Sequence, residues 1–200
     1  MLTRFPVVFL ALSVTFGTAI VDAPSEPAKA GLVAMRLKLS DGKSLELKAP
    51  KGGVLVLVYT STECPISNEY SPTLNELARG FPSEKFTMIG VCLDPDKTDA
   101  ELSSHAKEFS LVYPLAGDPK GKLAAKLGIK VTPEAVVIDE KDRIRYQGRI
   151  DDKYPERGKH KAIVESHDLR DAVSALLEGR EVKTPRTKAV GCPIPTPAKE

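Results

Sequence analysis

The sequence predicts an α/β fold in which a mixed central sheet is flanked by helices and preceded by a β-hairpin. Three observations lead to this prediction. Two apolar runs, 54–59 and 86–93, have the composition of strands buried on both faces, as in parallel or mixed sheets. Segments with apolar residues at three- and four-residue spacing follow these runs, so helices are expected to cover the sheet. Ser-Asp-Gly at 40–42 separates two short strand patterns and is a strong hairpin signal.

The later elements alternate along the chain. After the hairpin we expect a strand at 54–59, a helix at 66–81, a strand at 86–93, helices at 99–109 and from 118 to 128, strands at 132–139 and 143–150, and a helix from 166 to 179. Pro72 lies inside the first helical pattern and is predicted to kink it. Thr98 and Glu101 have the spacing of a capping box and mark the start of the next helix.

Length and composition limit the class of protein. The chain has 200 residues, which suits one domain of ordinary size with extensions at both ends. Its formal net charge is +2, so charge gives no reason to expect nucleic acid or an anionic membrane as a partner. Tryptophan is absent and charged residues are spread along the chain, as in soluble globular proteins.

The N-terminal region has the pattern of a secretory signal. Arg4 precedes an interrupted apolar run over 5–21, and small or apolar residues follow at 21–23. We therefore expect a signal peptide at 1–23, a linker at 24–31 and a periplasmic or secreted protein that does not span the membrane after cleavage. Cleavage near 28–30 and an uncleaved anchor are the alternatives.

The chain has three cysteines, an odd number that in an exported protein suggests one pair and one remaining thiol, or a reactive thiol. Cys92 lies within a strand pattern and is expected in the core. Cys64 and Cys192 lie in polar or proline-rich surroundings, so which two residues pair is left open at this point.

Cys64 lies where a strand is followed by a helix. Peptide N–H groups and the helix dipole favour an anion there, which lowers a thiol pKa. Pro65 suits the first helical position. The hydroxyl groups of Thr60, Ser61 and Thr62 could donate to a thiolate or to an incoming oxygen. A buried structural cysteine is the alternative.

Several motifs resemble one family. Strand, Cys-Pro and a helix with a proline eight residues after the cysteine resemble the thioredoxin fold, and Val-Thr-Pro-Glu at 131–134 resembles its cis-proline segment. The stretches 109–152 and 167–182, with the closing TPRTKAVGCPI, resemble the peroxiredoxin-like (alkyl hydroperoxide reductase/thiol-specific antioxidant, or redoxin) group of thioredoxin-like proteins. The likeness covers roughly 32–194, so we expect a redoxin domain at 32–182 and a proline-rich tail at 183–200.

The resemblance implies roles for particular residues. Cys64 would be the attacking thiol, Pro133 the cis-proline and Arg149 a polar residue near the site. Peroxiredoxins carry Pro-x-x-x-Thr-x-x-Cys, whereas this chain has Leu57 and Ser61 at the proline and threonine positions. The sequence also has serine at position 67, so a dithiol cycle within Cys-x-x-Cys is excluded.

Cys192 could supply the missing second thiol. If the tail folds back over the domain, a sulfenic acid or mixed disulfide on Cys64 could resolve to a Cys64–Cys192 disulfide. A structural disulfide that fixes the tail and a disordered tail with a free thiol are the alternatives.

The resulting functional prediction is an exported thiol-dependent oxidoreductase, either a peroxidase-like antioxidant or a thiol–disulfide exchanger. Its partners would be a peroxide or disulfide substrate and an external thiol reductant, with no cofactor and no metal. A copper-binding chaperone and a redox-inactive thioredoxin-fold domain are the alternatives. The histidines at 105, 160 and 167 are expected at the surface. The 149–154 segment either forms local salt bridges or orders a loop beside the active cysteine.

Overall fold

The computed structural model describes residues 27–194. The predicted signal peptide and the last six residues lie outside the described range. No helix within 27–194 combines the length and the apolar character needed to cross a membrane.

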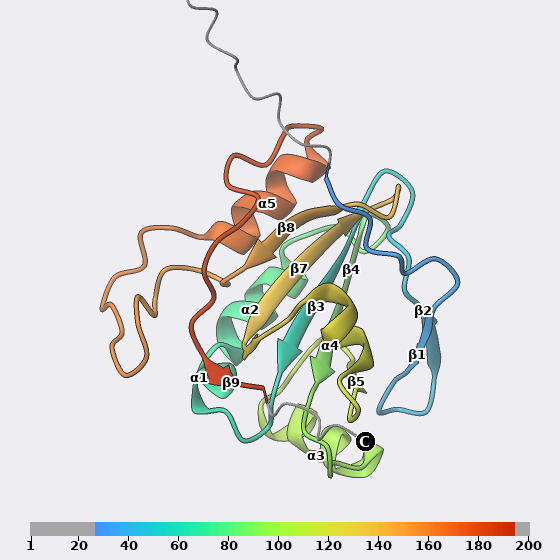
Figure 1. Ribbon diagram of the computed structural model, residues 1–200, viewed down its shortest axis with the longest axis vertical. Helices are drawn as coiled ribbons and strands as arrows, with labels where there is room; N and C mark the ends of the chain where they lie inside the picture. The colour runs from blue at the N-terminus through green and yellow to red at the C-terminus, as the bar shows by residue number, and fades with distance from the viewer. Residues whose placement is uncertain (1–26, 195–200) are drawn as a thin grey trace, which may run out of the picture.

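A five-stranded mixed sheet forms the centre of the domain, with the strand order β5-β4-β3-β7-β8 (Figure 1). The strands are β3 (Val54–Thr60), β4 (Phe86–Cys92), β5 (Leu115–Gly117), β7 (Glu134–Asp139) and β8 (Ile144–Gly148). β3, β4 and β5 are parallel, while β7 is antiparallel to β3 and β8 is antiparallel to β7. The mixed sheet predicted from the apolar runs is confirmed.

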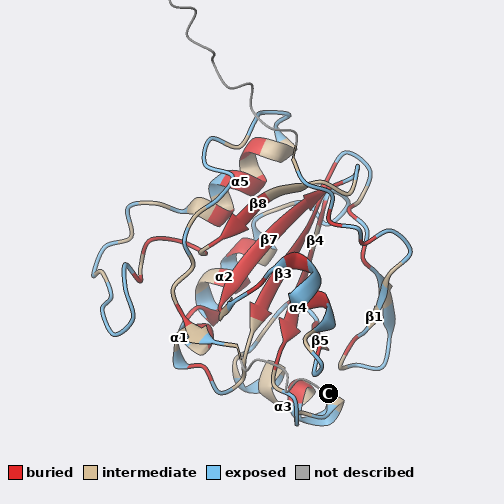
Figure 2. Ribbon diagram, viewed as in Figure 1, coloured by how far each residue is buried: buried red, intermediate tan, exposed pale blue. Residues whose placement is uncertain are grey.

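The helices cover both faces of this sheet. They are α1 (Pro65–Glu69), α2 (Ser71–Arg79), α3 (Asp99–Glu108), α4 (Lys122–Leu127) and α5 (Asp168–Leu177). Val54, Val56 and Val58 face the apolar cluster built with α2 and α5. The intervening Leu55 and Leu57 face α4 and the N-terminal hairpin. Because both faces of β3 are covered, the strand is buried along almost its whole length (Figure 2).

The N-terminal hairpin forms as predicted. β1 (Arg36–Lys38) pairs antiparallel with β2 (Ser44–Glu46). Gly42 in the turn has a φ of 85°, a left-handed conformation that glycine adopts without a steric penalty. The hairpin packs Leu39 and Leu47 against one face of the central sheet.

Two predicted helices need correction. The single kinked helix at 66–81 is two helices, α1 and α2, with Tyr70 between them. Pro72 lies in the first turn of α2, where its missing N–H leaves no hydrogen bond unmade, so it starts a helix instead of bending one. The last helix begins at Asp168 rather than Ser166, and His167 is its N-cap.

The predicted strand at 132–139 is also divided. β6 (Val131–Thr132) precedes Pro133, whose peptide bond with Thr132 is cis, and β7 follows it. β6 leaves the central sheet and pairs antiparallel with β9 (Cys192–Pro193) at the far end of the chain. β9 was not predicted, and β6 was not distinguished from β7, because two-residue strands carry no periodicity.

The C-terminal tail is attached to the domain at two places. Near its start, Gln147 of β8 donates its N–H to Pro185 O at 3.0 Å and accepts from Thr187 N at 3.1 Å. At its end, β9 pairs with β6, and the Ile194 N–H donates to Lys130 O at 3.2 Å. Figure 1 shows this red segment running from α5 across the domain to a position beside α1. The tail therefore brings Cys192 to the strand-to-helix corner.

Candidate functional site

Cys64 occupies the corner between β3 and α1. It is the N-cap of α1, with extended backbone angles (φ −84°, ψ 113°), and Pro65 takes the first helical turn. Its carbonyl accepts the Asn68 N–H at 3.1 Å. The sulfur is therefore held at the positive end of a short helix, as the sequence predicted, although the residue is only 1% exposed.

The corner lies against the cis-proline segment and the tail. Cys64 Sγ is 3.3 Å from the carbonyl oxygen of Thr132, the residue before cis-Pro133. It is 2.7 Å from Cys192 Sγ, although 128 positions separate the two cysteines in the chain. Both thiols are free, and a disulfide bond of about 2.0 Å needs only a short further approach.

β-Sheet pairing sets this proximity. Thr132 is the register partner of Cys192 in the β6–β9 ladder. Gly191 precedes Cys192 and passes so close to β6 that a Cβ atom there would lie 2.0 Å from Thr132 O. Thr132 and Gly191 were not candidate site residues in the sequence. The sequence analysis named only their neighbours, Pro133 after Thr132 and Cys192 after Gly191.

The two cysteine pKa values are shifted in opposite directions. Burial opposes ionisation of Cys64, but hydrogen bonding, first of all from the Cys192 thiol, outweighs it and places the Cys64 pKa below its ordinary value. The pKa of Cys192 is raised to about 11, and burial is the largest cause. The hydrogen bond to Cys64 and the negative charge of the Cys64 thiolate act on the Cys192 pKa in the same direction. Cys64 is therefore the thiol that ionises first, and Cys192 remains a proton donor to it near neutral pH.

This difference predicts the pH dependence of alkylation. Iodoacetamide reacts with thiolates, so the reaction of Cys64 is expected to reach half its maximal rate below the ordinary thiol pKa, and that of Cys192 near pH 11. Replacing Cys192 with alanine removes a hydrogen-bond donor, so the Cys64 midpoint should move to higher pH. Mass spectrometry of peptides alkylated over a pH series measures both midpoints. Equal midpoints, or a lower one for Cys192, would contradict this assignment.

The predicted hydroxyl groups have other partners. Thr62 donates both its N–H and its Oγ1 hydrogen to Asp94 Oδ2, at 2.6 and 2.7 Å. Ser61 Oγ accepts the Glu63 N–H at 3.2 Å. Thr60 is the last residue of β3, and its carbonyl accepts the Leu93 N–H at 3.0 Å. These residues shape the loop that carries Cys64. Among described residues, no hydrogen bond joins their side chains to its sulfur.

Arg149 lies at the junction of β8, α5 and the tail. Its Nε donates to Asp168 Oδ2 at 2.8 Å, and its backbone N–H donates to Thr187 Oγ1 at 3.0 Å. Within residues 27–194 no hydrogen bond connects Arg149 with either cysteine of the pair. The following Asp151 accepts from Tyr70 OH at 2.5 Å, so this acidic segment attaches its loop to the end of α1.

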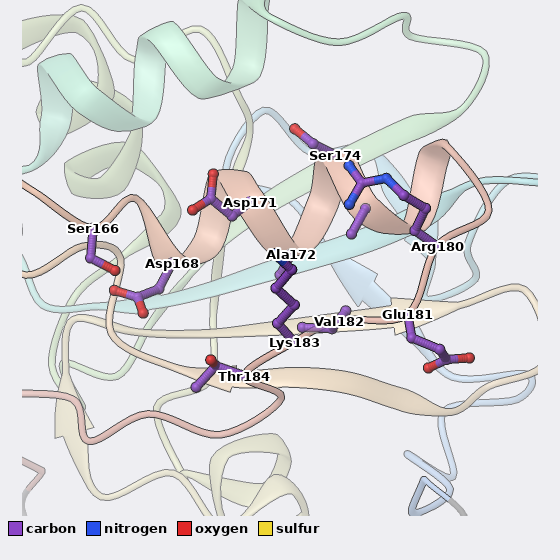
Figure 3. A pocket seen from close by; sticks show the side chains of 11 residues that line it. Ser166, Asp168, Asp171, Ala172, Ser174, Arg180, Glu181, Val182, Lys183 and Thr184 are labelled. Carbon is purple, nitrogen blue, oxygen red and sulfur yellow. The ribbon is translucent and has the colours of Figure 1, made fainter.

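A cleft of about 380 Å³ opens beside the two sulfurs. Its walls include Cys64, Cys192, Thr132, Ile194 and the segment 93–97 that follows β4. A separate cavity of about 270 Å³ lies along α5, lined by acidic and basic side chains such as Asp171 and Lys183 (Figure 3). This cavity shares no lining residue with the cysteine cleft. Because Cys64 and Cys192 line the cleft, the cleft is the candidate active site.

The third cysteine and the histidines show no arrangement that points to catalysis or metal binding within the described residues. Cys92 is buried at the end of β4, as predicted, and burial raises its pKa to about 12. His105 packs on Phe109 with ring centroids 4.5 Å apart. In the described part of the chain, no group of three or more His, Cys, Asp or Glu residues is arranged to hold a metal ion.

A cis-proline facing a cysteine at the start of a helix, beside a mixed sheet of this order, is the arrangement of thioredoxin-like proteins. Residues 23–163 match the family model described as Redoxin. The chain belongs to the redoxin family, which confirms the resemblance found in the sequence.

Named relatives agree with this family. Thiol-disulfide oxidoreductase ResA of Bacillus thuringiensis subsp. konkukian (strain 97-27) is 29% identical over 104 residues, which is 52% of this chain and 59% of ResA. A thiol:disulfide interchange protein DsbE homolog of Paracoccus denitrificans (strain Pd 1222) is 33% identical over 97 residues, 48% of this chain and 50% of that protein. The chain thus spans 50% to 59% of the length of these two curated relatives.

A solved structure shows the same fold over almost the whole chain. The crystal structure of a hypothetical protein from Sinorhizobium meliloti 1021 aligns with a TM-score of 0.74 at 24% identity. The alignment covers 89% of this chain and 98% of that protein. This alignment therefore extends beyond the regions matched in the two curated relatives above.

Proposed function

We propose that this protein is a thiol–disulfide oxidoreductase in which Cys64 is the nucleophile and Cys192 the resolving thiol. The observation that carries the proposal is the 2.7 Å separation of the two sulfurs, held by the β6–β9 ladder. Relatives named thiol-disulfide oxidoreductase and thiol:disulfide interchange protein support the same reaction class. The disulfide substrate and the external thiol reductant are parts of the proposal.

The proposed reaction has two exchange steps. The Cys64 thiolate attacks one sulfur of a substrate disulfide, forms a mixed disulfide and expels the other substrate sulfur as a thiolate. Cys192, after losing its proton, attacks Cys64 Sγ and expels the second substrate thiolate. The substrate gains two electrons, and the protein is left with a Cys64–Cys192 disulfide. An external dithiol then reduces this bond and restores both thiols.

The pKa values support this order of events. The hydrogen bond to Cys64 and its negative charge are two of the causes that raise the Cys192 pKa to about 11. Both disappear once Cys64 Sγ is bonded to a substrate sulfur. The second thiol therefore becomes easier to ionise at the step in which it has to attack.

Disulfides fit this corner better than peroxides do. The residue at the proline position of the peroxiredoxin motif is Leu57, buried in the middle of β3. The side chain of Ser61, at the threonine position, helps to hold Asp94 ionised. Leucine cannot take the place of that proline, and the Ser61 side chain already interacts with Asp94 and with the Glu63 N–H. Peroxide reduction through a Cys64 sulfenic acid, with loss of water when Cys192 condenses, remains the second substrate class.

Oxidation and peptide mapping test the proposal. The folded, reduced protein is exposed to a stoichiometric disulfide or to hydrogen peroxide, then alkylated and digested. We expect a Cys64–Cys192 cross-link with both oxidants, and faster with the disulfide. A fully oxidised, folded protein without this cross-link would overturn the resolving role. Stoichiometric Cu(I) uptake that needs both cysteines, without turnover, would instead favour the copper-binding alternative.

Export is also part of the proposal. The charged start and the interrupted apolar run at 5–21 support a periplasmic or secreted location. A pair of cysteines that cycles between thiols and a disulfide suits a compartment in which disulfides form and persist. Cell fractionation with a tag at the C-terminus, together with N-terminal sequencing of the mature chain, checks both location and cleavage.

A further inference from the structure

Thr62, two residues before Cys64, is held from both sides. Asp94 Oδ2 accepts the Thr62 N–H at 2.6 Å and the Thr62 hydroxyl at 2.7 Å. On the other side, Asn68 of α1 donates its Nδ2 hydrogen to Thr62 O at 2.9 Å. The backbone donor, the backbone acceptor and the hydroxyl of Thr62 are therefore all engaged, which fixes the conformation of the loop that carries Cys64.

Asp94 is itself held in one place. It lies just after β4, whose last residue is Cys92. The distance from Cys92 Sγ to the same Asp94 Oδ2 is 3.3 Å. The intervening Leu93 donates its N–H to Thr60 O at 3.0 Å, so the ends of β3 and β4 are joined beside the carboxylate. Asp94 thus connects the end of β4 to the loop that carries Cys64, through its two hydrogen bonds from Thr62.

The carboxylate is ionised at neutral pH. Burial opposes its charge, but hydrogen bonds from Ser61 and Thr62 outweigh this effect and hold the Asp94 pKa below its ordinary value. An ionised carboxylate only accepts hydrogen bonds, and bonds to it are stronger than those to a neutral amide. The titratable side chains that interact electrostatically with Asp94 include Lys97, His105 and the Cys92 thiol. Glu63 and Asp96 line the same cleft.

We propose that Asp94 is a positioning residue for the chemistry of Cys64, acting through Thr62 to hold the strand-to-helix corner where the sulfur meets Thr132 and Cys192. This role rests on the proposed function. A second effect of Asp94 opposes it, because a negative charge near a thiolate disfavours that thiolate. Loss of the positioning role would raise the Cys64 pKa, whereas loss of the negative charge alone would lower it.

The test replaces Asp94 with asparagine, which keeps the size of the side chain and removes its charge. If Asp94 positions the corner, the substitution weakens the hydrogen bonds from Thr62 and lets the Cys64 loop move away from Cys192. The Cys64 thiolate is then less stabilised, and the pH midpoint of Cys64 alkylation rises. If its charge is what matters, the midpoint falls. We also expect Cys64–Cys192 disulfide formation to slow about tenfold, because intramolecular reactions depend steeply on geometry.

Two further variants complete the comparison. Thr62→Val removes only the hydroxyl donor and should raise the midpoint in the same direction by a smaller amount. Asp96→Asn removes a charge from the same cleft, but no hydrogen bond joins Asp96 to residues 62–64 within the described chain, so its midpoint should not rise. Thermal unfolding of each reduced variant separates a local change at the corner from a general loss of stability.

The outcomes are distinct. A raised Cys64 midpoint in Asp94→Asn and Thr62→Val, with no rise in Asp96→Asn, supports the positioning role. A lowered or unchanged midpoint in Asp94→Asn overturns it. If the wild-type chain forms no Cys64–Cys192 disulfide, the proposed function fails, but the alkylation midpoints still decide the role of Asp94.

Discussion

Replacing Cys192 with serine is expected to stop the reaction after its first half and leave the protein joined to its substrate through Cys64. Cys192 Sγ lies 2.7 Å from Cys64 Sγ, whereas Cys92 is directed toward Asp94. In well-oriented intramolecular reactions the effective concentration of the attacking group reaches about 10⁵ M or more, so about 1 mM of external thiol cannot replace it. We therefore expect turnover to fall at least about 100-fold.

The adduct can be measured directly. Incubation of Cys192→Ser with a small aromatic disulfide should add the mass of one substrate thiol, located on Cys64 by peptide mapping. The double variant Cys64→Ser, Cys192→Ser is the matched control and should gain no such mass. Turnover by Cys192→Ser at the wild-type rate would mean that the second thiol of the cycle comes from outside the chain.

The central part of the fold was predictable because local patterns and tertiary packing agree there. The uninterrupted apolar run at 54–59 became β3, buried on both faces, and the capping box of Thr98 and Glu101 begins α3 with both of its hydrogen bonds present. Cys64, just past the end of β3, was recognisable as a candidate nucleophile for the same reason. Its location follows from the order of a strand and a helix, which the sequence shows directly.

The rest of the site depends on contacts between distant segments. β6 and β9 have two residues each and stabilise each other across 60 positions of chain, so neither has a pattern of its own. Asp94 follows an apolar strand as an ordinary polar residue, and its partner Thr62 lies 32 positions earlier. Its position after β4 was the available signal, because the ends of parallel neighbouring strands meet at one edge of a sheet. Thr62 was predicted to serve the sulfur, but its hydroxyl donates to Asp94.

Gly191→Ala is expected to displace the end of the tail and slow formation of the Cys64–Cys192 disulfide at least about tenfold, since a misplacement of about 1 Å can cost about 100-fold in a positioned reaction. A Cβ atom at position 191 would lie 2.0 Å from Thr132 O, 2.5 Å from Thr132 C and 3.0 Å from Pro133 N. These are backbone atoms of the segment that leads directly into β7 of the central sheet, so the tail is the part that has to move.

The change should be confined to the last few residues. The upstream attachment of the tail, where Gln147 bonds Pro185 and Thr187, does not involve Gly191 and should hold the tail on β8. Cys64, 1% exposed beneath the end of the tail, should then become more accessible to iodoacetamide even as its cross-link to Cys192 forms more slowly. Faster alkylation with slower disulfide formation distinguishes a displaced tail from a damaged Cys64.

Gly117→Ala provides the matched control. The nearest atoms to a Cβ there are Pro119 Cδ at 3.6 Å and Leu102 Cδ1 at 3.7 Å, which is ordinary van der Waals contact. Quenched-flow alkylation followed by mass spectrometry gives the cross-linking rate of both variants, and thermal unfolding confirms that both are folded. If Gly191→Ala cross-links as fast as Gly117→Ala, the tail reaches Cys64 without the β6–β9 ladder. Chain proximity, and not strand pairing, would then bring the second thiol to the first.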